Sequence, residues 1–354
     1  MGENPTVNSR PAGRINSIDT VKGVAIVLMV FGHTAQGGLH RHLWDAQPGM
    51  VRGLYFAESF IYSFHMAAFF FVSGLFIAGS VARRGAPGFT LEKIRTLLYP
   101  YILWGVAFAL LNPLTARFRM SAQAFSWRSF FWDLSSGNSS WFLITLFVCQ
   151  LLALVLLLVR LPYWLQMAVA LAGCFFVPAS DVAVLFQPFL YLPFVIAGSW
   201  FSGSRMQMLE RLPGRYAWIG FVLLLALQLA MINAWGQVTR WNKVPIGLAG
   251  TLMLLLMSQA IRGSATDNAL RWYGEGSLAV FVLSPFFQGV GREFVTRVLH
   301  TSNPWAYLGF TTIFAATIPA ALWFAQDRLH IGWLFRWPAP KKHNVVVEAQ
   351  SATR

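Results

Sequence analysis

Residues 141–159 read WFLITLFVCQLLALVLLLV, a run of nineteen residues without a charged side chain. An α-helix of about 20 apolar residues spans the ~30 Å hydrocarbon core of a bilayer. Comparable apolar runs recur between residues 24 and 325, and only 11% of the 354 residues are charged, against roughly 25% in soluble domains. This composition excludes a soluble globular protein and a disordered chain. We therefore expect an all-α polytopic membrane protein with little mass outside the bilayer.

Ten candidate spans are separated by charge clusters, prolines and glycines. A window of about 19 residues places them near 23–39, 56–80, 94–114, 141–159, 163–179, 184–201, 217–236, 244–261, 277–299 and 304–326. An even number of spans puts both termini on one side, and 18 of the 27 Lys and Arg residues fall on that side. Because basic residues are enriched in cytoplasmic loops, we expect both termini in the cytoplasm.

The chain then divides into a cytoplasmic N-terminal segment (1–20), a membrane domain (21–330) and a cytoplasmic tail (331–354). The N-terminal residues lack the apolar segment and cleavage site of a signal peptide, and we expect the residues after Trp337 to be mobile. Residues 125–134 (FSWRSFFWDL) are aromatic and amphipathic but too short to cross, so we expect them on the outer surface.

The net charge of +14 comes from basic residues that lie between apolar runs. This distribution is typical of topology signals, whereas nucleic-acid binding needs a basic face on a folded domain. We therefore expect contact with membrane lipids, no nucleic-acid partner and no metal. The two cysteines, Cys149 and Cys174, lie in apolar runs, which excludes a fold held by disulfides.

An ionisable residue at mid-membrane costs at least ~2.5–3.5 kcal/mol and therefore indicates a functional site. His33 follows Lys22 by eleven residues, which is about 16 Å of helix, or roughly half of the hydrocarbon core. Eleven residues is also close to three helical turns, so Lys22 and His33 share a face. A core histidine that is satisfied by a neighbouring polar group remains the alternative interpretation.

The second span adds a carboxylate and another histidine. Glu58 and His65 are seven residues apart, two helical turns, so they also share a face. With His33 they form a predicted polar seam that suits proton transfer between a base, an orienting partner and a donor. Alternatively, Glu58 meets the lipid headgroups at the outer end of the span.

The two ends of the predicted bundle differ in chemistry. Lys93 and Arg95 lie in the basic loop between the second and third spans, on the same side as Asp19 and Lys22. Such clusters bind phosphates, although basic residues are expected in any cytoplasmic loop.

On the outer side, Trp132, Asp133 and Trp141 accompany a stretch rich in Ser, Asn and Gly (135–140). This combination suits a sugar ring, although Trp is equally expected in an interfacial belt.

Five sequence blocks resemble the acyltransferase type 3 family, the polytopic membrane O-acyltransferases that modify bacterial surface and exported glycans. The blocks are 14–33 (RINSIDTVKGVAIVLMVFGH), 63–74 (SFHMAAFFFVSG), 93–101 (KIRTLLYPY), 140–143 (SWFL) and 274–287 (GEGSLAVFVLSPFF). They occur in the family's order and cover about residues 14 to 290.

The resemblance implies that the donor is acetyl-CoA, bound at the cytoplasmic side of a bacterial inner membrane. It implies an acceptor sugar hydroxyl on an exported or lipid-linked glycan, such as an exopolysaccharide repeat unit. Carried onto this chain, it implies that His33 is the catalytic base and that Lys22, Lys93 and Arg95 help to hold the donor. Asp19 would orient Lys22.

The chain departs from the family pattern at three places. The basic residue of the opening block is more often Arg than Lys, and the paired arginines of some members appear only as Lys93 and Arg95. Ser284 stands where relatives often have a His, and we place Ser284 in the acceptor site.

A secondary transporter or flippase is the alternative function, because ten helices, proline-broken spans and a His/Glu seam also serve as a proton relay. The five blocks and the lack of visible symmetry between the two halves favour the acyltransferase.

Overall fold

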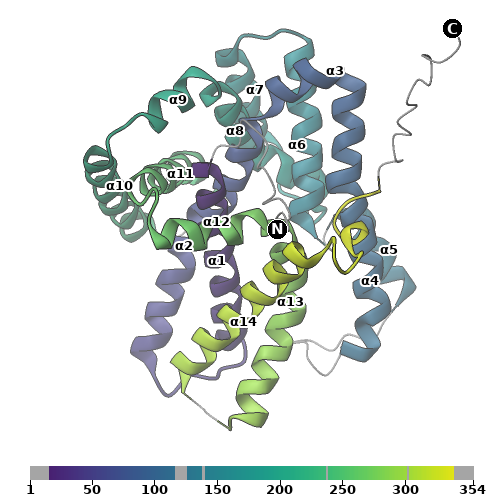
Figure 1. Ribbon diagram of the computed structural model, residues 1–354, viewed down its shortest axis with the longest axis vertical. Helices are drawn as coiled ribbons and strands as arrows, with labels where there is room; N and C mark the ends of the chain where they lie inside the picture. Colours follow the sequence, from purple (N-terminus) through teal and green to yellow (C-terminus); the bar gives the residue numbers. More distant parts are fainter. Residues whose placement is uncertain (1–15, 116–125, 138–139, 237, 301–302, 339–354) are drawn as a thin grey trace, which may run out of the picture.

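The computed structural model describes residues 16–115, 126–137, 140–236, 238–300 and 303–338, and within these ranges every element is a helix (Figure 1). In chain order they are α1 (Asn16–Leu39), α2 (Pro48–Gly74), α3 (Ile77–Lys93), η1 (Ile94–Leu98), α4 (Tyr99–Thr115), α5 (Trp127–Ser136), α6 (Trp141–Leu158), α7 (Tyr163–Phe176), α8 (Ala183–Phe201), α9 (Ser204–Glu210), α10 (Gly214–Trp235), α11 (Lys243–Ala260), α12 (Ala265–Glu275), α13 (Ser277–Glu293), η3 (Phe294–Val298), α14 (Pro304–Ala325) and η4 (Gly332–Leu334).

Each predicted span contains a helix. In the described part of the chain, nine helical segments are long and apolar enough to cross a membrane. The fifth predicted span is shorter, because α7 has 14 residues. Pro162 precedes α7, and Val177 after it is extended (ψ 125°) because it stands before Pro178. The prediction of an all-α polytopic membrane protein is confirmed.

The prediction of a loop between the second and third spans is wrong, because residues 81–93 are helical. α2 ends at Gly74, α3 begins at Ile77, and α3 continues directly into η1. A break lies inside α3 at Gly85, whose φ of 67° is in the left-handed region that glycine adopts without strain. The basic composition suggested a loop, but Lys and Arg are good helix formers and do not oppose a helix.

α1 lies at the centre of the bundle, where it contacts α2, α11, α12, α13 and α14 (Figure 1). Two glycines bring its first turns against α12. A Cβ on Gly23 would lie 1.8 Å from the Leu270 carbonyl oxygen, and one on Gly274 would lie 1.8 Å from the Asp19 carbonyl oxygen. Such direct backbone contact is typical of small residues between membrane helices, and it fixes the start of α1.

α2 crosses α8 in the same way. A Cβ on Gly74 would lie 2.1 Å from the Val195 carbonyl oxygen, and one on Gly198 would lie 1.9 Å from the Phe71 carbonyl oxygen. The two crossings therefore fix the start of α1 and the end of α2.

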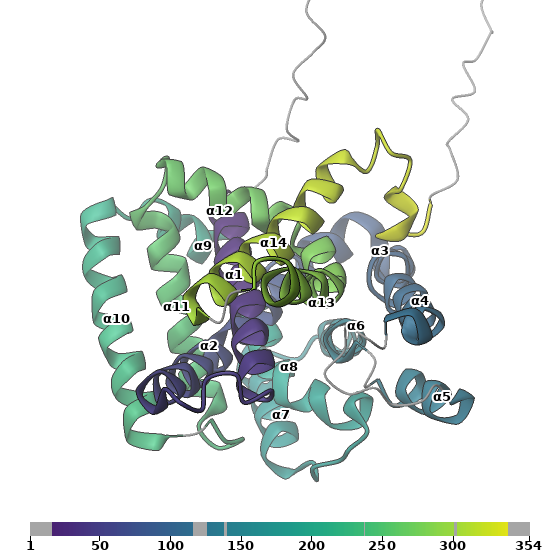
Figure 2. The ribbon, with the colours of Figure 1, turned by 90° about the horizontal axis from the view of Figure 1, so that it is seen from below.

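α1 begins and α14 ends at the same end of the bundle, beside α12, and we call this the α12 end (Figure 2). Trp272 of α12 stacks on Phe324 of α14 with ring centroids 5.4 Å apart. Beyond α14, the Trp337 N–H donates to the Arg95 carbonyl oxygen at 3.1 Å, so residues 331–338 lie against η1. Residues 1–15 and the rest of the tail, including the segment predicted to be mobile, lie outside the described residues.

The predicted amphipathic segment forms the short helix α5, which lies at one edge of the molecule with α4 and opposite α10 (Figures 1 and 2). Trp127, Phe131 and Trp132 are more than half exposed on it. Gly137, with φ of 85°, ends the helix and lets the chain turn toward α6.

Candidate functional site

Two hydrogen bonds connect α1 to α2 inside their spans. The Tyr62 hydroxyl lies 2.9 Å from Nδ1 of His33, and Gln36 Nε2 donates to Glu58 Oε1 at 3.1 Å. Gln36 lies one turn after His33, and Glu58 lies one turn before Tyr62, so the two bonds are neighbours. The structure thus brings the predicted seam residues His33 and Glu58 together, but through Tyr62 and Gln36.

Tyr62 also contacts His65. Its ring centroid lies 5.7 Å from that of His33 and 4.9 Å from that of His65, both in edge-to-face geometry. His65 is 1% exposed, and its Nδ1 donates to the Ile61 carbonyl oxygen at 2.8 Å. His33, by contrast, keeps an accessible face. Of the two histidines, His33 is therefore the one that a substrate can reach.

An ion pair lies on the same helix at the α12 end. Lys22 Nζ lies 2.7 Å from Asp19 Oδ1. The Asp19 side chain is only 7% exposed, whereas that of Lys22 is 25% exposed. The Thr20 hydroxyl between them donates to Asp267 of α12 at 2.5 Å, which holds this turn of α1 in place. The ammonium is thereby fixed at an accessible position beside a buried carboxylate.

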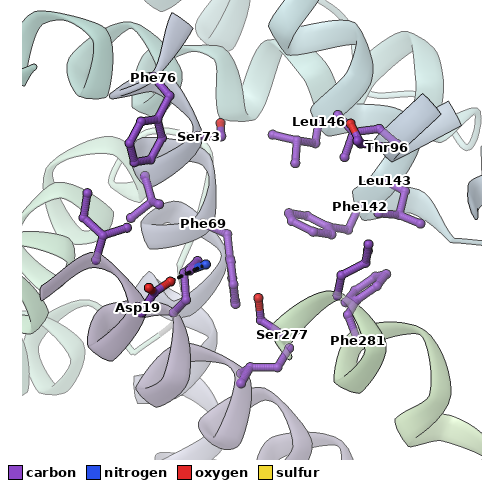
Figure 3. A pocket seen from close by; sticks show the side chains of 16 residues that line it. Asp19, Phe69, Ser73, Phe76, Thr96, Phe142, Leu143, Leu146, Ser277 and Phe281 are labelled. Carbon is purple, nitrogen blue, oxygen red and sulfur yellow. Dashed lines mark ion pairs between the residues drawn. The ribbon is translucent and has the colours of Figure 1, made fainter. Parts of the chain in front are cut away.

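A cavity of about 480 Å³ opens beside this ion pair, and Figure 3 shows Asp19, Phe69, Phe142 and Phe281 around it. Its volume is within the ~300–1,000 Å³ that is typical of small-molecule sites. The lining comes from α1, α2, η1, α6 and α13, and consists of Ile18, Asp19, Lys22, Ile26, Phe69, Val72, Ser73, Phe76, Thr96, Leu97, Phe142, Leu143, Leu146, Ser277, Leu278 and Phe281. The lining is therefore mostly apolar, with one ion pair and three hydroxyl groups.

The cavity borders the first part of the α1 face that Lys22 and His33 share. Lys22 and Ile26 line it, and His33 lies seven residues beyond Ile26 on the same face. On α2, Phe69 lines the cavity and Tyr62 lies seven residues before it on the same face. Seven residues is about 10 Å of helix. The His33–Tyr62 pair therefore lies about one helix diameter deeper than the nearest lining residues.

Four phenylalanines, which we call the aromatic wall, pack together beside the cavity, and three of them line it. Phe142 is at their centre, with ring centroids 5.7 Å from Phe69, 5.4 Å from Phe70 and 4.9 Å from Phe281. These rings come from α2, α6 and α13. The wall therefore ties together three of the helices that line the cavity.

Trp141 contacts Phe142 of the aromatic wall, with ring centroids 6.3 Å apart, and does not line the cavity. Its ring centroid is 5.4 Å from that of Tyr191, and Tyr191 in turn stacks on Phe70 at 4.4 Å. Trp141 is half-buried. Of the predicted acceptor residues, Trp141 is thus the one connected to the aromatic wall, while Trp132 and Asp133 lie exposed on α5.

The remaining predicted site residues lie around this centre. Lys93 and Arg95 shortly precede the lining residues Thr96 and Leu97 in sequence but do not line the cavity themselves. Lys93 Nζ lies 5.0 Å from the Phe89 ring centroid. Ser284 is 1% exposed, and its hydroxyl has no hydrogen-bond partner among the described residues.

Three polar residues of the site were missed by the sequence analysis. Tyr62 and Gln36 lie on the faces of Glu58 and His33, so helical spacing was the available signal. The third is Gln288 of α13, whose Nε2 donates to the Val30 carbonyl oxygen at 3.0 Å, one turn from His33. The feature of the sequence that could have identified Gln288 is a polar side chain within an apolar span.

Comparisons with known proteins identify the family of the chain. Residues 15–324 match the family model described as an acyltransferase domain. The chain is also similar to the nodulation protein NolL of Mesorhizobium japonicum, with 29% identity over 338 residues that cover 92% of this chain and 81% of the relative. No solved structure matches it. Since the family match extends through nearly all the described helices, the chain belongs to the acyltransferase type 3 family of membrane O-acyltransferases.

Proposed function

We propose that the protein transfers an acetyl group from cytoplasmic acetyl-CoA to a sugar hydroxyl of an exported or lipid-linked glycan, with His33 as the general base. The face of α1 that joins the Asp19–Lys22 pair, the cavity and the His33–Tyr62 pair carries this proposal. It offers a cation at one end, a mostly apolar cavity beside it, and an imidazole farther along the same face. This order matches a donor with phosphates, a long uncharged arm and a reactive thioester.

The residues present fit such a donor. Lys22 supplies a point charge for a phosphate oxygen, and Asp19 holds the ammonium at the cavity edge. The hydroxyls of Ser73, Thr96 and Ser277 lie in the apolar lining, where their oxygens can accept hydrogen bonds from the amide N–H groups of the arm. Lys93 and Arg95, beside Thr96 in sequence, would add positive charge outside the cavity.

The proposed reaction needs one proton acceptor. When Nδ1 of His33 donates to the Tyr62 oxygen, the lone pair of Nε2 takes the proton of the acceptor hydroxyl. The acceptor oxygen then attacks the thioester carbonyl, the C–S bond breaks as the C–O bond forms, and CoA leaves as the thiol with that proton. Tyr62, Glu58 and His65 act as positioning residues, and Ser284 and Trp141 would lie toward the acceptor.

The orientation follows from the charge distribution. The donor is cytoplasmic, so the α12 end, where Lys22 lies, faces the cytoplasm in this proposal, together with both termini. The bias of 18 in 27 basic residues toward that side supports it. The membrane would be a bacterial inner membrane.

The test compares two histidines of the same chain. Membranes with wild type, His33→Asn or His42→Asn receive labelled acetyl-CoA and the host's glycan fraction. His42 is an exposed residue between α1 and α2 that pairs with Asp45, so it serves as the matched control. We expect His33→Asn to lose transfer by about 100-fold or more, with normal protein levels and normal acetyl-CoA binding, while His42→Asn transfers normally.

Transfer by His33→Asn would refute the mechanism. Failure of wild type to bind acetyl-CoA, together with donor-independent uptake of substrate into sealed vesicles, would favour the transporter instead.

A further inference from the structure

Lys243 is a cation within the bundle that the proposed chemistry does not use. It is the first residue of α11, and its Nζ lies 4.5 Å from the ring centroid of Tyr191, which is only 6% exposed. One turn later, a Cβ on Gly247 would lie 2.7 Å from the Phe194 ring and 2.9 Å from Ala67. This face of α11 therefore points between α2 and α8, toward the interior.

The ammonium has no carboxylate within ion-pair distance in the described part of the chain. The contact with Tyr191 offsets only part of the cost of removing a cation from water, since a cation–π contact contributes about 0.5–2 kcal/mol. A buried or half-buried charge in a membrane domain is otherwise paired. Lys243 is half-buried, and its Nζ is not one of the fully buried polar atoms that lack a partner. An incoming anion can therefore reach it.

The surroundings of Lys243 connect it to the proposed reaction centre. Tyr191, beneath the ammonium, also contacts Trp141, so the cation adjoins the aromatic pair that contacts the aromatic wall. Lys243 lies within electrostatic range of His65, whose ring packs against Tyr62. A group held by Lys243 would thus sit beside the wall and near the His33–Tyr62 pair.

The sequence offers a useful comparison in Arg240, three residues earlier. Its guanidinium donates to the carbonyl oxygens of Phe175 and Val177 at 3.1 and 2.8 Å, so its hydrogen bonds are used within the protein. The backbone N–H of Lys243 donates to the Thr239 carbonyl oxygen at 3.0 Å, but its ammonium makes no hydrogen bond to the described residues. The two neighbouring cations therefore differ in role: Arg240 fixes the end of α7, and Lys243 is available for a ligand.

We infer that Lys243, with Tyr191 and Trp141, binds an anionic group of the acceptor, so that the preferred acceptor is an acidic glycan or a diphosphate-linked sugar. This inference rests on the proposed function and specifies its substrate class. The ammonium binds carboxylate or phosphate oxygens, and the two aromatic rings contact the adjoining sugar.

The test measures binding with probes that differ in one group. Octyl glucuronide carries a carboxylate where octyl glucoside carries a hydroxymethyl group, and a short prenyl diphosphate glucose is compared with the prenyl glucoside. Purified wild type, Lys243→Gln, Lys243→Arg and Arg52→Gln are titrated with all four. Arg52 is an exposed cation on α2, outside the site, and serves as the matched control.

We expect wild type and Arg52→Gln to bind the anionic member of one pair about tenfold more tightly than the neutral member, the scale of one charge-assisted contact. Lys243→Gln should bind both members equally, and Lys243→Arg should retain the preference. The pair that shows the preference identifies the source of the anion. Equal binding of both members of both pairs by wild type would overturn the inference, as would an unchanged preference in Lys243→Gln.

Acetyl transfer to the same probes separates this inference from the proposed function. A charge preference that depends on Lys243, in a protein that acetylates no sugar even with its donor bound, would uphold the anion site and refute the glycan acetyltransferase. Transfer that depends on His33 but not on the charge of the probe would support the glycan acetyltransferase and refute the anion site.

Discussion

The Tyr62 hydroxyl lies 2.9 Å from Nδ1 of His33, and the edge of the same tyrosine ring meets His65. Together with the Gln36–Glu58 hydrogen bond, this contact joins α1 and α2 at the point where chemistry is proposed. Because Nδ1 is engaged, the orientation of the imidazole depends on Tyr62. The role of His33 as a base therefore depends on a residue of the next helix.

Tyr62→Phe tests this dependence. The ring and its packing remain, but the hydrogen bond is lost, and a bond to a group that becomes charged is worth about 1.5–3 kcal/mol. We expect kcat for acetyl transfer to fall roughly tenfold or more while KM for acetyl-CoA stays unchanged. Initial rates over a range of acetyl-CoA concentrations measure both. Tyr55→Phe, on the exposed side of α2, is the control; equal rates in the two variants would contradict the role of Tyr62.

Lys22→Gln tests the donor end of the α1 face that Lys22 and His33 share. It removes the ammonium that Asp19 holds at the cavity, so we expect KM for acetyl-CoA to rise about tenfold, with acceptor KM unchanged. Lys22→Arg should restore donor binding, since the guanidinium supplies the forked contact that the lysine lacks. Arg211→Gln, an exposed cation at the end of α9, is the matched control. A rise in acceptor KM alone would place Lys22 elsewhere in the reaction.

The spans could be predicted because hydropathy is a local property. Pro162 and Pro178 even explain the short α7, since each acts on its immediate neighbours. Residues 81–93 were predicted to form a loop, but they lie in α3, because basic side chains are as common on a surface helix as in a loop. Local composition alone therefore did not distinguish a loop from a surface helix.

The site could be predicted only along each helix. Lys22 and His33 share a face because spacing within a helix follows from 3.6 residues per turn, and α1 is continuous between them. The pairing of His33 with Tyr62 depends on the register between α1 and α2, which the close glycine contacts help to set. Such contacts join residues distant in sequence, so the spacing within each span did not reveal them.

Gly23→Ala tests whether the crossing of α1 and α12 positions the donor end. The new methyl group would lie 1.8 Å from the Leu270 carbonyl oxygen, so the helices must separate. We expect a loss of about 1–3 kcal/mol in stability, seen as a lower Tm in detergent, and a higher KM for acetyl-CoA as the Asp19–Lys22 turn shifts. Gly309→Ala on α14, where a Cβ meets nothing within 4 Å, should leave Tm unchanged or slightly higher. Equal Tm values for the two variants would show that the crossing tolerates separation.

Phe142→Ala tests whether the aromatic wall sets the length of the transferred acyl group. Phe142 lines the cavity and contacts Phe69, Phe70 and Phe281, so its removal extends the space toward Trp141. Butyryl-CoA carries two more methylene groups than acetyl-CoA, and burying them is worth about 0.8 kcal/mol each. We therefore expect the ratio of kcat/KM for butyryl-CoA over acetyl-CoA to rise roughly tenfold. Phe147→Ala, on α6 but outside the cavity, should leave this ratio unchanged. If Phe142→Ala retains its fold by Tm and its ratio equals that of wild type, the acyl group does not end at the wall, and the thioester must reach His33 by another face of α1.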